Sequence, residues 1–155
     1  MATSAVPAAI DALLSLLGDA PGLSTVRVVD GPPGPNFTQK DLLYVGYAPG
    51  SDMAAEMQQR FASAGARRRD EDASLSCYIE SRRGDTNIRD RRRHVFEILA
   101  VVETALRATN EDPTAPNLGG AVLWSDLTAG SLMQAQTESG ALAGLAFTVH
   151  FRARI

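Results

Sequence analysis

The sequence predicts an α+β fold, with a single antiparallel sheet of about six strands and two helices packed on one of its faces. Two segments have apolar residues at the spacing of one helix face, and six others have the composition or the alternation of β-strands. Short glycine-containing connections separate the last three strand segments, which is typical of antiparallel neighbours. With 155 residues and no internal repeat, the chain is expected to form one domain, 1–155.

The first helix is predicted around residues 7–17, and Gly18 followed by Pro21 ends it. The second helix follows Gly84, with Asp85 or Thr86 as its N-cap. Both have apolar residues at intervals of three and four, so each presents one face to the core. These residues are Ile10, Leu13, Leu14 and Leu17 in the first helix, and Ile88, Val95, Leu99, Val102 and Leu106 in the second.

The predicted strands give the element order α-β-β-β-α-β-β-β, with the last three strands as an antiparallel meander. Gly130 and the Ser139–Gly140 pair mark the tight connections of that meander. Within the third strand, Cys77 alternates with polar neighbours, which favours a small buried apolar residue over a nucleophile. The predicted strands are 26–29, 42–47, 73–80, 121–126, 131–137 and 142–154.

The stretch 51–71, between the second and third predicted strands, fits two local structures. Met53, Met57 and Phe61 are four residues apart, which suits a helix. Met57 and Phe61 also have the same parity, which suits one face of a strand. Because a connection of about 20 residues is usually functional or mobile, we expect 51–71 to be a long mobile loop.

Composition excludes several classes of function. The net charge of -3 argues against a general nucleic-acid binder, which would be strongly basic. The single cysteine, Cys77, rules out an intramolecular disulfide and a thiolate zinc site. His94 and His150 lie on different predicted elements without ligand-spaced neighbours, so both are read as surface residues. Without a nucleophile elbow or a P-loop, we expect no enzyme, no metal and no cofactor.

The N-terminus lacks the charged and apolar regions of a secretory signal. No apolar run approaches the ~20 residues of a membrane-spanning helix. We therefore expect a soluble chain made in the cytoplasm, with no membrane partner.

Two groups of arginines have competing interpretations. One group follows the long loop, and the other occupies the first turns of the second helix, where positive charge is mildly unfavourable against the helix dipole. They can contact a neighbouring subunit or nucleic-acid phosphates. Alternatively they pair within the chain, for example with Asp90 and Glu97, or are simply solvated. The arginines are Arg67, Arg68, Arg69, Arg89, Arg91, Arg92 and Arg93.

Several segments together, in this order, resemble phage tail terminator proteins from actinobacterial hosts. None of them is diagnostic alone, but the ordered set spans nearly the whole chain from Leu13 onward. The segments are 23–33 with its proline-rich end, 43–47, 65–71, 84–86 ahead of the arginine-rich helix, 118–124 and 147–155.

The resemblance implies a minor tail or neck protein of long-tailed phages or phage-like particles. Such proteins form a homohexameric ring that caps the tail tube, ends its polymerisation and joins it to the head. The implied partners are the major tail tube protein and the head-completion or connector proteins, with DNA only passing through the ring lumen. The implied location is the virion, after assembly in the bacterial cytoplasm.

In that family the loop equivalent to 51–71 tends to be mobile in the free subunit and ordered in the ring, as an extended hairpin. The helix-like spacing from Met53 to Phe61 departs from that pattern. Here the resemblance makes Met57 and Phe61, with Met53 nearby, the apolar anchors of an interface, and Arg67 to Arg69 the charged residues that set its register. A head-completion or adaptor protein of the same neck is the nearest alternative. A nucleic-acid-binding accessory module that uses the two arginine groups is a more distant one.

Overall fold

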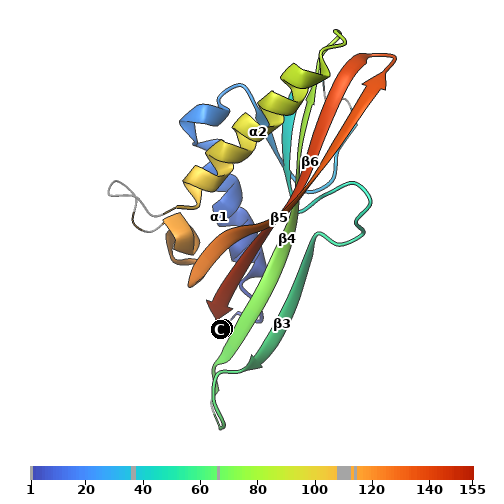
Figure 1. The fold of residues 1–155 in the computed structure, drawn as a ribbon. Helices are drawn as coiled ribbons and strands as arrows, with labels where there is room; N and C mark the ends of the chain where they lie inside the picture. The colour runs from blue at the N-terminus through green and yellow to red at the C-terminus, as the bar shows by residue number, and fades with distance from the viewer. Residues whose placement is uncertain (1, 36–37, 66, 108–112, 114) are drawn as a thin grey trace.

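The computed structural model describes residues 2–35, 38–65, 67–107, 113 and 115–155. In this part of the chain, helices α1 (Val6–Gly18) and α2 (Ile88–Ala105) cover one face of a six-stranded sheet (Figure 1). Two short 3-10 helices, η1 (Pro21–Leu23) and η2 (Ala115–Gly120), connect these elements. The predicted α+β class, with helices packed on a sheet, is confirmed.

The sheet has the order β1-β2-β4-β6-β5, and β3 also pairs with β4. The long strands β4 and β6 pair along nearly their whole length. The other edge of β4 pairs with β3 along its first half and with β2 along its second half. Between the two, the Gly46 N–H donates to the Ser76 carbonyl, and the Ser76 N–H donates to the Ala54 carbonyl. The strands are β1 (Arg27–Asp30), β2 (Asp41–Val45), β3 (Ala55–Phe61), β4 (Arg69–Arg82), β5 (Trp124–Thr137) and β6 (Gly140–Arg154).

The prediction of a single antiparallel sheet is corrected in one respect. β1 and β2 run parallel, with Arg27 opposite Leu42 and Asp30 opposite Val45, whereas the other pairs are antiparallel. A parallel pair requires the chain to cross back to the starting end before the second strand begins. The connection between Asp30 and Asp41 makes that return, so the sheet is mixed.

The prediction of a long loop over 51–71 is wrong, because two strands occupy parts of that segment. Residues 55–61 form β3, and β4 begins at Arg69, so the two strands make a hairpin with Phe61 opposite Arg69. This settles the choice between helix and strand for Met57 and Phe61 in favour of the strand. The start of β4 was missed because residues 69–72 are all charged, so they show no alternation of apolar and polar side chains.

The predicted meander of three strands is also corrected. Residues 124–137 form one continuous strand, β5, which is irregular between Leu127 and Ala129. Gly130 therefore lies within a strand, and only the Ser139–Gly140 turn connects two strands. The N-cap of α2 is Asn87 instead of Asp85 or Thr86, because the Asn87 side chain accepts the backbone N–H of Asp90 at 3.1 Å.

The main core lies between the helices and the sheet. Leu13 and Leu17 of α1 and Val95 of α2 are fully buried against the inward residues of β4 and β6. Cys77 is fully buried, and its burial raises the pKa of the thiol to about 12. The prediction of a small buried apolar residue is confirmed.

Candidate assembly interface

The β3–β4 hairpin carries large apolar side chains in contact with solvent. Met57 and Phe61 on β3 are 52% and 63% exposed, and Met53, just before β3, is 55% exposed. Figure 1 shows the hairpin at the lower end of the sheet, with β3 as an outer strand, and β4 stays paired with β6 as far as Asp70 and Arg154. The three predicted anchors therefore lie outside the subunit's core, available to a partner.

A buried carboxylate fastens this hairpin to α1. Glu71 of β4 is fully buried and accepts hydrogen bonds from the backbone N–H of Ala5 at 2.8 Å and the hydroxyl of Ser4 at 3.0 Å. Gln59 of β3 donates to the same carboxylate at 2.6 Å and to the carbonyl of Thr3 at 2.8 Å. A negative charge is favourable at a helix N-terminus, so Glu71 replaces the missing side-chain cap of α1.

The other two acidic residues of the run 70–72 are paired as well. Asp70 accepts from Arg154 at 2.8 Å and from Arg152 at 3.1 Å, and the hydrogen bond from Arg154 is the main cause of its lowered pKa. Asp72 pairs with Arg60 across the hairpin at 3.2 Å. The run 70–72 is thus structural, and the described residues contain no group of three metal-ligating side chains.

The arginines at the hairpin tip remain largely unpaired. Arg69 places its guanidinium over the ring of Phe61, 5.3 Å from the centroid, in a cation–π contact. Arg67 and Arg68 are exposed, and neither forms an ion pair with any residue that the structure describes. We call Arg67, Arg68 and Arg69 the tip arginines.

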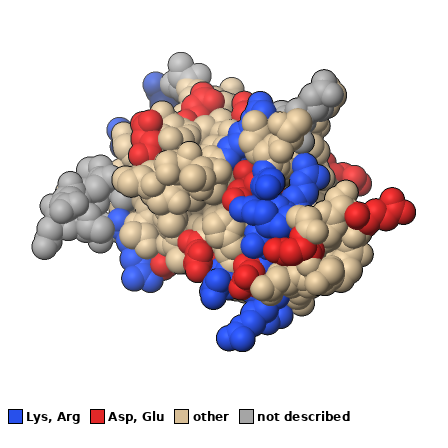
Figure 2. Space-filling model, turned by 90° about the horizontal axis from the view of Figure 1, so that it is seen from above, with Lys and Arg blue, Asp and Glu red and all other residues tan. Residues whose placement is uncertain are grey.

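The arginines of α2 lie at the opposite end of the molecule from the hairpin tip (Figure 1). Figure 2 looks onto this end and shows basic side chains interspersed with acidic ones. Arg93 lies 3.2 Å from Asp90 and 3.7 Å from Glu97, as the internal-pairing interpretation predicts. The structure therefore does not bring the two predicted basic groups together. The exposed α2 arginines are Arg89, Arg92 and Arg93.

A buried polar cluster, absent from the sequence prediction, joins α2 to the sheet. Asp41 accepts two hydrogen bonds from Arg83, at 3.0 and 2.8 Å, one from Ser81 at 2.7 Å, and lies 3.1 Å from His94. Burial alone would raise the pKa of Asp41, but these donors outweigh it and lower the pKa to about 2. His94, predicted at the surface, is held by this contact between α2 and β2.

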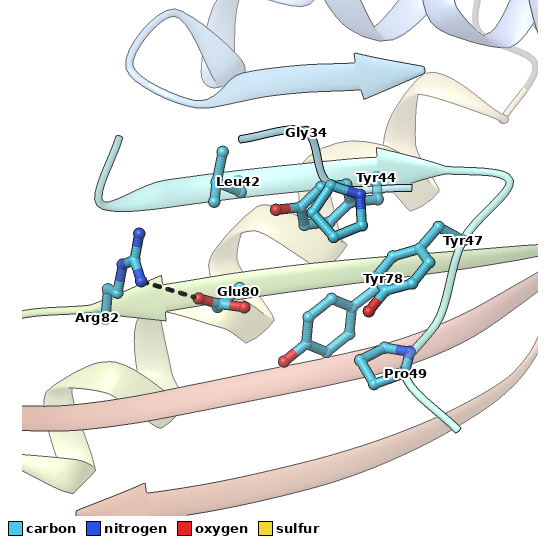
Figure 3. Close-up of a pocket in the computed structure, with 9 residues that line it drawn as sticks. Gly34, Leu42, Tyr44, Tyr47, Pro49, Tyr78, Glu80 and Arg82 are labelled. Atoms are coloured by element: carbon cyan, nitrogen blue, oxygen red, sulfur yellow. Dashed lines mark ion pairs between the residues drawn. The ribbon is translucent and has the colours of Figure 1, made fainter. Parts of the chain in front are cut away.

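The opposite face of the sheet carries a tyrosine-lined pocket of about 350 Å³, which sequence reasoning also missed (Figure 3). The ring of Tyr44 lies 5.2 Å from Tyr47 and 6.1 Å from Tyr78, measured between centroids. Burial raises the pKa of the Tyr44 and Tyr78 phenols, so both stay protonated near neutral pH. One signal in the sequence was available: Tyr44 and Tyr78 alternate with the core-facing residues of their strands, so both point to the face away from the helices. The remaining lining residues are Pro33, Gly34, Leu42, Pro49, Glu80 and Arg82.

No protein-family model matches the sequence, and no curated protein matches it. Neither helix within the described ranges is long and apolar enough to cross a membrane. The features that indicate a function are therefore the hairpin, its exposed apolar side chains and its tip arginines.

Proposed function

We propose that this chain is a structural subunit of a phage tail, a tail terminator that works by assembly and not by catalysis. Six copies form a ring that caps the tail tube, ends tube polymerisation and offers a surface to the head-completion proteins. The observation that carries this proposal is the hairpin, where Met57 and Phe61 are more than half exposed. The ordered segments that resemble tail terminators supply the specific identity.

Apolar surface that is exposed to water is unfavourable. Large apolar side chains that group on an exposed outer strand therefore mark a surface for another protein. Phe61 beside Arg69 has the composition of an interface anchor, an aromatic ring with an arginine. Glu71, opposite Gln59 and two positions from the last pair of the hairpin, holds the hairpin against α1, so less conformational entropy is lost when the hairpin docks.

The proposed partners are other copies of the chain, the major tail tube protein and the head-completion proteins. The proposed location is the virion neck, where DNA passes through the ring lumen. The proposal needs no cofactor. An adaptor protein of the same neck would use the same hairpin, and it differs in binding the head side without limiting tube growth.

The test adds the purified chain to polymerising tail tube protein and measures tube lengths by electron microscopy. We expect shorter tubes with a ring at one end. Unchanged tube lengths together with binding to connector proteins would support the adaptor alternative. A shift of DNA in low salt that disappears in high salt, without ring formation, would support the nucleic-acid alternative.

A further inference from the structure

A second apolar surface lies along α2, far from the hairpin. One hollow of about 380 Å³ lies between η1 and α2, and a second of about 240 Å³ lies between α2 and β5. Ala100 lines both, so the two hollows are neighbours across α2, and we call them together the α2 groove. Its lining is Ala20, Pro21, Gly22, Phe96, Leu99, Ala100, Val101, Glu103, Thr104, Ala105 and Leu127.

The α2 groove is preformed and open to solvent. Phe96 is 46% exposed, and Ala100 and Thr104 are exposed on the same outward side of α2. Gly22 fits η1 closely onto α2, because a Cβ at this position would lie 2.7 Å from a methyl group of Val101. The floor of the larger hollow is therefore tightly packed and shaped before anything binds.

The groove and the hairpin are complementary in chemistry. The hairpin projects an aromatic ring, Phe61, and the tip arginines, whereas the groove offers an apolar hollow. Carboxylates border the groove: Glu103 lines it, Glu97 lies one helical turn before Val101, and Asp19 precedes Ala20. Arg93 and Arg107 also lie along α2, paired with Glu97 and Glu103. These pairs are exposed, contribute little to stability, and exchange partners readily.

The hairpin cannot fill the groove of its own chain. Figure 1 shows η1 and α2 on the helical side at the upper left, and the hairpin tip at the lower end. None of the residues that line the two hollows belongs to β3 or β4. The surfaces are complementary but separate, as a head-to-tail contact between copies requires.

We infer that the occupant of the α2 groove is the β3–β4 hairpin of a second copy of this chain, with Phe61 in the apolar hollow and the tip arginines facing Glu97, Glu103 and Asp19. This inference rests on the proposed function and specifies its subunit contact. The contact is heterologous, so each copy in a ring uses its hairpin on one neighbour and its groove on the other.

The test uses two single substitutions, Phe61→Cys on the hairpin and Ala100→Cys in the groove, with a mass-altering tag on one chain. Cys77 stays in place, because it is fully buried, and the unsubstituted chain under the same oxidant is the control. We expect a mixed disulfide when the two chains are combined, and little dimer from either alone. The absence of the mixed product, or equal dimer from Phe61→Cys alone, would overturn the inference.

A second readout follows association without oxidation. Phe61→Asp and Ala100→Arg each remove one half of the contact, so each alone should weaken self-association by about tenfold or more. Mixed together, they retain one intact pair and should form dimers but no larger species. Gln58→Asp on the outward face of β3 and Ala8→Arg on α1 are matched exposed controls that should associate normally.

The two proposals fail separately. If the unsubstituted chain forms rings but the mixed disulfide is absent, the contact lies elsewhere and the tail terminator proposal stands. If the mixed disulfide forms but no ring appears, the inferred contact is correct and the proposed hexameric ring is wrong. Rings that form equally well with Phe61→Asp would also overturn the inferred contact.

Discussion

Tyr78 lies directly over Gly144 on the outward face of the sheet. A Cβ at position 144 would stand 2.1 Å from the Tyr78 hydroxyl oxygen and 2.7 Å from the adjoining ring carbon. Tyr78 faces Ala146 on β6, so its side chain crosses diagonally to cover the glycine. The absence of a side chain at 144 is therefore what allows the three tyrosines to line one pocket.

Gly144→Ala should lower the free energy of unfolding by about 1–3 kcal/mol, because the tyrosine must leave its place in a packed cluster. Gly130→Ala on β5 is the matched control, since a Cβ there meets Ala146 at an ordinary 3.7 Å. Urea denaturation measures both. Equal stability of the two variants would contradict the described packing of Tyr78.

Asp41 predicts a specific pH dependence. Its folded pKa of about 2 lies below the ordinary value of 3.8 for this carboxyl, so its contribution to stability is present above pH 4 and is lost as the pH falls through 2. Asp41→Asn should be less stable than the parent at pH 6 by about 2 kcal/mol or more. That difference should shrink toward pH 2, with Asp52→Asn, at an exposed site, as the control. A difference independent of pH would show that the charge of Asp41 is not responsible.

Glu71→Ala should detach the hairpin from α1. The substitution leaves the N–H of Ala5 and the amide of Gln59 without their acceptor, at a cost of about 1–3 kcal/mol. Hydrogen exchange of the Ala5 amide should accelerate more than that of residues in β6. Glu56→Ala, exposed on the same hairpin, should change neither quantity. Unchanged hydrogen-exchange protection of the Ala5 amide in Glu71→Ala would contradict the role of Glu71 as the cap of α1.

Phe61→Asp should separate stability from assembly. The ring is 63% exposed, so the free energy of unfolding should change by no more than about 0.5–1 kcal/mol, including the lost cation–π contact with Arg69. Denaturation monitored by circular dichroism tests this directly. A large loss of stability would show that Phe61 packs within its own subunit, and would contradict its proposed role at the interface.

Local periodicity predicted the parts of the fold that depend on local burial. The helix face of Leu13 and Leu17 and the alternation around Cys77 both correspond to the observed core, because each pattern reports one buried face. The exposure of Met57 and Phe61 also agrees with the prediction, although their segment was predicted to be a loop. Large apolar side chains among polar neighbours are visible in a sequence whatever the backbone does.

The features that were missed depend on partners distant in sequence. Glu71 reads as a solvated acid, since its main donor, the Ala5 amide, is 66 positions away. The burial of Asp41 likewise depends on Arg83 and His94, which lie 42 and 53 positions away in the sequence. The α2 groove requires η1 to lie against Val101, which no spacing within α2 indicates. Contacts between different helices and strands form these sites, whereas hydrophobic periodicity describes only one helix or strand at a time.

The central claim is that copies of this chain form a closed ring through the hairpin. Native mass spectrometry of the chain, alone and with tail tube protein, measures this most directly. The account predicts a species of six times the 16.5 kDa subunit mass, which grows with concentration or on addition of tube protein and is absent from Phe61→Asp. A strict monomer under both conditions, or an open series of oligomers without a six-fold limit, would contradict it.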